Sequence, residues 1–244
     1  MTSTSPAGIT RAAAAAPRAR VLVLLDPRGA FAAVAARPLW ALGVIVMLAF
    51  AVVPPLVFVA RTDATAIVKR ELQQSGKMEQ LTPEQREQAL ALGAKGTKIL
   101  LPIGAAAKRS IWMTCLTLVL LGLLKGSRPD LKMSPVAGAV AVAMAPLAVH
   151  DVLVAVTFLI KDPMQLDATN AVLSNPAAWL GFDAGHSVAG ALLRGFDFFE
   201  LWACWLVGLG VNAVANSRSS LPYVVAFGGH IVTTLISVIG PALR

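Results

Sequence analysis

The sequence predicts an all-α protein, a polytopic bundle of transmembrane helices that crosses the bilayer five times. Of its 244 residues, 57% are hydrophobic and only 14% are charged, whereas about 25% of an average soluble domain is charged. The charged residues are clustered, and the uncharged runs between clusters are long enough to span hydrocarbon. Lys and Arg at the membrane surface therefore explain the net charge of +8, and we expect no nucleic-acid partner.

The N-terminal segment is basic and does not resemble a signal peptide. Its only apolar stretch outside an alanine tract, residues 21–25, is far too short for the core of a signal peptide and ends at Asp26. We expect residues 1–20 to form a flexible cytoplasmic tail that helps to set the orientation of the chain in the membrane.

Residues 21–37 are predicted to form an interfacial amphipathic segment. Asp26 can cap a helix, and Pro27 suits its first turn. Phe31, Val34 and Ala35 share one face, with Arg28 and Arg37 at the ends. This pattern indicates a short helix that lies on the membrane surface.

Residues 38–243 are predicted to form the membrane domain. Uncharged runs, terminal prolines and flanking charges set the expected bounds of its helices. The expected spans are residues 38–60, 98–124, 135–160, 196–216 and 221–243. The short connection between the last two predicts a tight antiparallel pair.

Three spans contain residues that disfavour a plain apolar helix. Pro54–Pro55 predicts a kink or a break in the first span. Lys108 and Arg109 shorten the second, and we expect both side chains to snorkel outward to the interface. His150–Asp151 interrupts the third span with two ionisable groups near its middle.

Residues 61–98 are predicted to form an extracytoplasmic helical loop. A first helix is expected around residues 64–74, ended by Ser75–Gly76. Thr82 and Gln85 match a capping box that begins a second helix, which we expect Gly93 to end. The loop is too small for a domain and suits a helical hairpin.

Lys and Arg in the loops predict the N-terminus inside and the C-terminus outside. Five Arg precede the first span, and three basic residues lie between the second and third spans. The longer loop after the third span has only two. Seven Lys or Arg in residues 61–98 argue for the opposite orientation, and we weight the N-terminal cluster more heavily.

Two short motifs stand out, one leading into the first expected span and one at the start of the fourth. The first is Leu-Leu-Asp-Pro-Arg-Gly-Ala-Phe followed by Ala-Arg-Pro-Leu-Trp, and the second is Phe-Asp-Phe-Phe-Glu-Leu-Trp before a Gly-rich helix. Both resemble motifs of bacterial Yip1-domain membrane proteins. The residues that carry the resemblance are Asp26, Pro27, Phe31, Arg37, Pro38, Trp40, Phe196, Asp197, Leu201 and Trp202. It covers roughly residues 22 to 243.

The resemblance implies a five-helix domain with a cytoplasmic N-terminus. Eukaryotic relatives of that family act in vesicle trafficking with small GTPases. The bacterial branch has no general assigned activity, and some of its members accompany export-type ABC transporters as accessory subunits.

Five ionisable residues form a candidate intramembrane polar cluster. They are His150, Asp151, Asp197, Glu200 and His230. Ionisable groups are costly in hydrocarbon, so they predict either an ion- or proton-handling site across spans three to five or interhelical hydrogen bonds that fix packing. No metal-binding spacing such as HExxH occurs, and we expect no metal site.

Small residues predict close packing of the fourth span on the fifth. Gly208 and Gly210 precede Asn212, and Gly228–Gly229 precede His230. Helix backbones approach closely at such residues, and nearby polar side chains can bridge the helices. The five tryptophans lie mostly near span ends and are expected to be interface anchors.

These observations favour a non-enzymatic multi-pass protein of the bacterial inner membrane, without a cofactor. Its expected partners are membrane lipids and other membrane proteins, with ABC transporter subunits among the candidates and a homo-oligomer as an open alternative. The second hypothesis is a small transporter or channel that uses the polar cluster. An enzyme is disfavoured because no P-loop, Rossmann or nucleophile-elbow motif occurs.

Overall fold

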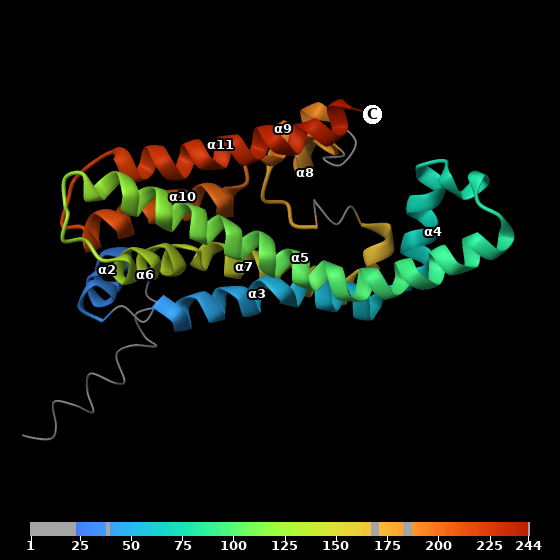
Figure 1. Ribbon diagram of the computed structural model, residues 1–244, viewed down its shortest axis with the longest axis horizontal. Helices are drawn as coiled ribbons and strands as arrows, with labels where there is room; N and C mark the ends of the chain where they lie inside the picture. Colours follow the sequence, from blue (N-terminus) through green and yellow to red (C-terminus); the bar gives the residue numbers. More distant parts are fainter. Residues whose placement is uncertain (1–22, 38–39, 167–170, 183–186, 244) are drawn as a thin grey trace, which may run out of the picture. The chain divides into compact units, whose positions relative to one another are not determined.

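The computed structural model describes residues 23–37, 40–166, 171–182 and 187–243. The predicted tail, the first two residues of the interfacial segment and Pro38 therefore lie outside the described residues. The described parts are helical and contain no strand, which confirms the predicted all-α class (Figure 1). The helices discussed below are α2 (Pro27–Ala36), α3 (Trp40–Arg61), α4 (Ala64–Gln74), α5 (Pro83–Lys125), α6 (Met133–Ala143), α7 (Ala145–Ile160), α8 (Pro176–Leu180), α9 (Val188–Arg194), α10 (Phe198–Val214) and α11 (Leu221–Ala242).

Among the described residues, four helical segments are long and apolar enough to cross a membrane. They are α3, α5, the combined run Met133–Ile160 and α11. A fifth crossing is counted if α9 and α10, which bend by 45° at the break between them, form one span. The fourth span was expected from about residue 196 to 216, and α10, with 17 residues, lies within those bounds.

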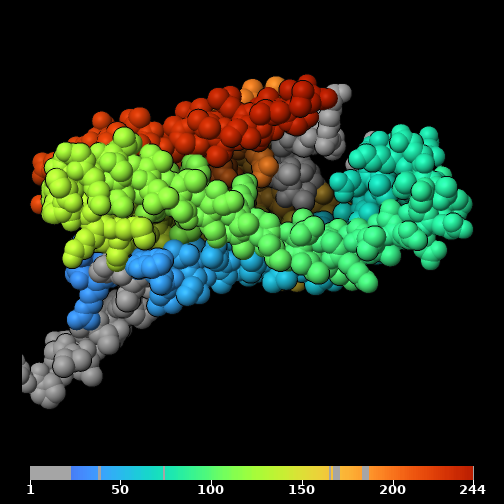
Figure 2. Space-filling model, in the orientation of Figure 1, coloured from blue at the N-terminus to red at the C-terminus, as the bar shows by residue number. Residues whose placement is uncertain are grey.

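Helix α5 is much longer than the predicted second span. It has 43 residues, which at about 1.5 Å per residue extend about 65 Å, roughly twice the hydrocarbon thickness. The expected end at Gly93 is wrong, because the helix continues through it. The absence of a side chain at Gly93 instead lets α4 approach: a Cβ there would lie 2.6 Å from Cγ1 of Val68. Figure 2 shows α5, in green, exposed along the face in view.

The third span is broken, although not at His150–Asp151. Helix α6 ends at Ala143 and α7 begins at Ala145, with Met144 between them. Pro146 explains the break, because a proline has no backbone N–H and its ring clashes with the carbonyl four residues earlier. By contrast, α3 stays helical through Pro54–Pro55, so the alternative of a helix break there is wrong.

The extramembrane loop follows its sequence signals closely. Helix α4 has the predicted bounds, and Gly76 adopts a left-handed conformation with φ of 67° after its end. The capping box at the start of α5 is reciprocal: the Thr82 N–H donates to Gln85 Oε1 at 3.0 Å, and the Gln85 N–H donates to Thr82 Oγ1 at 3.3 Å. These contacts confirm the predicted helix at residues 64–74 and the predicted capping box.

The chain divides into two compact units, which are described separately. Unit 1 contains residues 1–47, 112–147 and 198–233, and unit 2 contains residues 48–111, 148–197 and 234–244. In unit 1, α10 packs on both α6 and α2. In unit 2, the phenyl rings of Phe58 and Phe158 bring α3 and α7 together with ring centres 5.4 Å apart.

The apolar face of α2 is occupied by protein in unit 1. Asp26 caps the helix as predicted, since its carboxylate accepts from the Gly29 N–H at 3.0 Å. Ala30, Phe31 and Val34 are buried, whereas Ala35 is exposed. Phe31 and Val34, which share the predicted apolar face, therefore pack against protein, because α10 and α6 cover this face.

Gly210 allows the contact between α10 and α2. A Cβ at this position would lie 2.4 Å from Cε1 of Phe31, whose side chain is fully buried. A ring enclosed in this way has little room to move aside, because protein interiors are close-packed.

We therefore expect Gly210→Ala to lower the free energy of unfolding by about 1–3 kcal/mol, as overpacking does. The matched control is Gly228→Ala on α11, where nothing lies within 4 Å of the added methyl group. Thermal unfolding of both variants in detergent measures the difference. Combining Gly210→Ala with Phe31→Ala should be less harmful than the sum of the two, and strict additivity would contradict this packing.

Candidate functional site

A salt bridge links Arg109 of α5 to Asp151 of α7 within unit 2. Nη2 of Arg109 donates to Oδ2 of Asp151 at 3.1 Å and to Oδ1 at 3.3 Å. The two side chains are only 14% and 11% exposed. The prediction that Arg109 snorkels outward is therefore wrong, whereas the neighbouring Lys108 is exposed. Consecutive residues of a helix point about 100° apart, which separates their environments.

The salt bridge lies deep within the apolar part of both helices. Ile99, Leu100 and Leu101 are 59%, 66% and 41% exposed, and these consecutive residues point about 100° apart around α5, as expected of a helix surrounded by lipid. Arg109 follows Lys98 by eleven residues, and Asp151 precedes the end of α7 by nine. At about 1.5 Å per residue these offsets are about 16 and 14 Å, or roughly half of a 30 Å hydrocarbon core.

The guanidinium of Arg109 is only partly satisfied. Nη1 is buried and has no hydrogen-bond partner among the described residues. A single nitrogen, Nη2, makes both contacts with the carboxylate. The strongest arginine–carboxylate pairs are instead bidentate, with two guanidinium nitrogens each donating to one oxygen. A buried pair of this kind fixes which residues face each other more than it stabilises the fold.

A second contact between ionisable side chains joins α10 to α11 in unit 1. Nδ1 of His230 lies 3.6 Å from Oε2 of Glu200, and the two side chains are 10% and 43% exposed. One turn along α10, the Cys204 thiol contacts the Ala226 carbonyl at 3.6 Å. These contacts connect the two helices on the same side as the glycine contact described below.

The third acidic residue, Asp197, lies at the break between α9 and α10. Its carboxylate accepts a hydrogen bond from the Ser174 hydroxyl, and both residues are buried. Asn175 caps α8 beside it, accepting from the Ala178 N–H at 3.0 Å. The loop before α8 therefore folds against the break within unit 2.

Among the residues of the predicted polar cluster, Asp151 contacts Arg109, Glu200 contacts His230 and Asp197 contacts Ser174. His150, which is half-buried, and Asp151 and Asp197 belong to unit 2, whereas Glu200 and His230 belong to unit 1. Arg109, the partner of Asp151, was not among the predicted residues. The described part of the chain contains no group of three or more His, Cys, Asp or Glu side chains arranged to hold a metal ion.

The glycines of α10 contact two different helices. A Cβ at Gly208 would lie 2.1 Å from Cδ1 of Tyr223, which confirms the predicted packing of α10 on α11 at that position. Gly210 contacts α2 instead. Gly229 lies against the ring of Trp112 on α5, so this tryptophan packs on protein rather than serving only as an interface anchor.

Asn212 organises the turn between α10 and α11. Its Nδ2 donates to the Ser219 carbonyl at 2.8 Å, and its Oδ1 accepts from the Ser219 N–H at 3.2 Å. Asn212 therefore fixes the turn, and its hydrogen bonds go to the turn rather than across to α11 as predicted.

Most residues of the two motifs form helices or lie at helix ends. Asp26, Pro27 and Phe31 build α2, Arg37 follows its end, and Trp40 begins α3. Leu201 and Trp202 are half-buried on α10, and the ring of Trp202 lies 5.5 Å from that of Phe198. Phe196 is 63% exposed.

Comparison with protein-family models, curated proteins and solved structures finds no match for this chain.

Replacing one partner of the Arg109–Asp151 salt bridge should destabilise the protein more than replacing both partners. We expect Arg109→Met to destabilise the protein by about 3–5 kcal/mol, because it leaves Asp151 buried without its partner. The double variant Arg109→Met/Asp151→Leu should recover most of that loss, and Lys108→Met should change little. Thermal unfolding in detergent measures all four proteins; a double variant no better than Arg109→Met would contradict the pairing.

Proposed function

We propose that this chain is a non-enzymatic scaffold or accessory subunit of the bacterial inner membrane that binds other membrane proteins. The observation that carries the proposal is the pairing of charges within the apolar helices. Arg109 contacts Asp151, and Glu200 contacts His230, so each pair joins two helices. Side chains that contact each other in this way hold the helices in register. The outward faces of the helices then remain available to bind a partner.

Large outward faces support this proposal. In the most apolar stretch of α11 only 11% of residues are buried, against 67% in the run Met133–Ile160. Exposed side chains of α3, α5 and α11 include Ile45, Ile103 and Leu235 at 63%, 58% and 55%. These faces offer area both to lipid and to helices of a partner. The resemblance to bacterial Yip1-domain proteins makes an export ABC transporter the partner that we propose first.

The five-crossing topology is part of the proposal and rests on chain connectivity. The boundaries between the two units fall within α3, α5, α7 and α11 and at the α9–α10 break, so the chain passes between units five times. In unit 2, Arg70 donates to the Met164 carbonyl at 3.1 Å, joining the loops that flank α5 and α7. In unit 1, Arg128 donates to the Asn216 carbonyl at 3.2 Å, joining the other two loops. Five crossings give each pair of loops a common side.

A transporter or channel is the alternative. The unpartnered Nη1 of Arg109 and the broken α9–α10 pair favour it, because discontinuous helices with buried polar groups form the binding sites of many transporters. The paired arrangement of the charges favours the scaffold.

Cysteine labelling tests the topology. In a background with Cys115→Ala and Cys204→Ala, we expect Ser75→Cys and Met164→Cys to react with a membrane-impermeant maleimide from outside the inner membrane. Ser127→Cys and Ser219→Cys should react only after the membrane is opened. Labelling of Ser75→Cys and Ser127→Cys from the same side contradicts a single crossing by α5.

Site-specific photo-crosslinking tests the function. A photoreactive residue at Ile45, Ile103 or Leu235 should crosslink a distinct membrane protein in native membranes from at least one position, whereas the fully buried Leu120 should not. The variant Arg109→Met/Asp151→Leu should keep that partner, because the salt bridge has a structural role. Crosslinks to lipid alone from all three positions, or loss of the partner in a folded double variant, would overturn the scaffold.

A further inference from the structure

The loops and short helix of unit 1 form a cationic rim. Its exposed or half-buried basic residues are Arg28, Arg37, Lys125, Arg128, Lys132 and Arg218. The acidic residues of unit 1 outside its long helices are Asp26 and Asp130, and both have contacts. Asp26 caps α2, and Oδ1 of Asp130 lies 3.9 Å from Nε of Arg128. The rim is therefore strongly positive.

The rim is built on an ordered backbone. The hydrogen bond from Arg128 to Asn216 ties the α5–α6 loop to the α10–α11 turn. Asn212 fixes that turn through the backbone of Ser219. Helix α2 packs on α6 and α10, so its basic residues are attached to the same unit.

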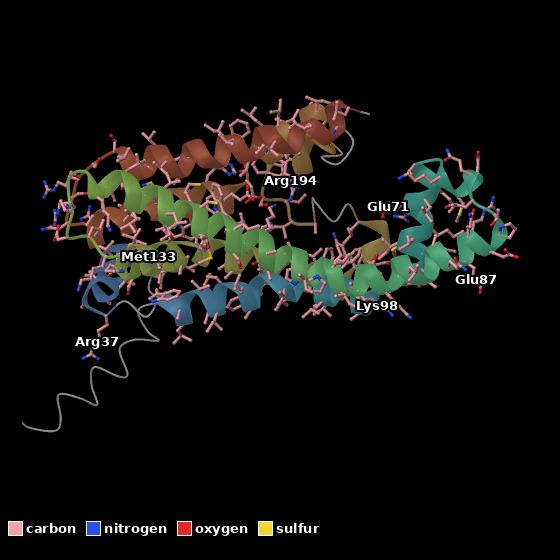
Figure 3. All side chains as sticks on the ribbon, in the orientation of Figure 1. Arg37, Glu71, Glu87, Lys98, Met133 and Arg194 are labelled. Atoms are coloured by element: carbon pink, nitrogen blue, oxygen red, sulfur yellow. The ribbon has the colours of Figure 1, made fainter. Side chains whose placement is uncertain are left out.

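Helix α2 contributes basic side chains to the cationic rim and does not insert an apolar face into lipid. Its apolar face is buried, and Arg28 and Arg37 lie on the exposed remainder. Figure 3 shows the Arg37 side chain extending outward from the end of α2. A helix held in this way presents cations at the surface without inserting into the acyl chains.

We propose that this cationic rim binds the headgroups of anionic phospholipids. Lys125 ends α5, Lys132 directly precedes α6, and Arg218 lies three residues before α11, where apolar helices meet the headgroup layer. At that level the nearest negative charges are lipid phosphates, which attract basic residues within about one Debye length, roughly 8–10 Å. The position at three helix ends favours lipid over an acidic protein segment.

The hairpin of unit 2 provides the contrast. Residues 61–98 carry seven Lys or Arg and five acidic residues, so most of their charge is balanced. The inference rests on the membrane-crossing helices of the proposed function but not on its protein partner. A failed search for that partner therefore leaves the lipid test unaffected.

The experiment compares lipid retention by three forms of the full chain. They are the wild type, the rim variant Lys125→Gln/Lys132→Gln/Arg218→Gln and the hairpin control Lys69→Gln/Lys77→Gln/Lys95→Gln, which removes three exposed cations from unit 2. Each is reconstituted in equal phosphatidylglycerol and phosphatidylcholine, re-extracted in mild detergent and analysed for co-purifying lipid by mass spectrometry. Thermal unfolding verifies that all three are folded.

We expect phosphatidylglycerol to be enriched on the wild type and on the hairpin control. The rim variant should lose at least about fivefold of that enrichment, and 0.5 M salt should reduce it in the wild type. A wild type without preference, or an equal loss in the hairpin control, overturns the proposal; the first result assigns the rim to an acidic protein partner instead.

Discussion

An ionisable side chain in hydrocarbon requires a partner, and much of this structure satisfies that requirement. Asp151 would be costly alone, and Arg109 meets it from the adjacent helix with contacts of 3.1 and 3.3 Å. His230 contacts Glu200, and Asp197 contacts the hydroxyl of Ser174. Each pairing joins elements that are far apart in sequence.

The second constraint is the close approach of two aromatic side chains to the backbone of α10. Gly208 and Gly210 point to nearly opposite sides of α10, because two residues turn a helix by about 200°. One side receives Tyr223 of α11 and the other receives Phe31 of α2. The Glu200–His230 contact lies between the same two helices as the Gly208 contact, and both restrict how α11 can rotate against α10.

The sequence predicts most strongly where the signal is local. The α4 bounds, the Asp26 cap and the reciprocal Thr82–Gln85 box follow from neighbouring residues, and each is present. The bounds of α3 and α11 follow from charge spacing, whereas α5 extends well before its predicted span and Pro146 divides the third span. Gly93 shows the opposite error, since a glycine expected to end a helix serves close packing within α5.

The candidate site was predicted only in part because pairing is a long-range property. The sequence identifies Asp151 as costly but contains no signal that its partner is Arg109, 42 residues away. Arg109 is next to Lys108, and the two were expected near the end of a span. Basic side chains at that position usually extend toward the membrane surface. The available clue was depth, because the nine residues 99–107 of α5 are apolar and place Arg109 away from the predicted start of the span.

Depth also separates the roles of the basic residues. Arg109 is deep and needs a carboxylate from the protein, whereas Lys125, Lys132 and Arg218 lie at helix ends where lipid phosphates are available. The same residue types thus serve packing in one place and surface attraction in another. Because the deep charges are engaged with one another, changes at the outward faces and at the cationic rim should alter binding without altering the fold. In a transporter that moved substrate past its deep polar groups, binding and fold could not be changed separately. Substitution of those groups would alter transport and helix packing together.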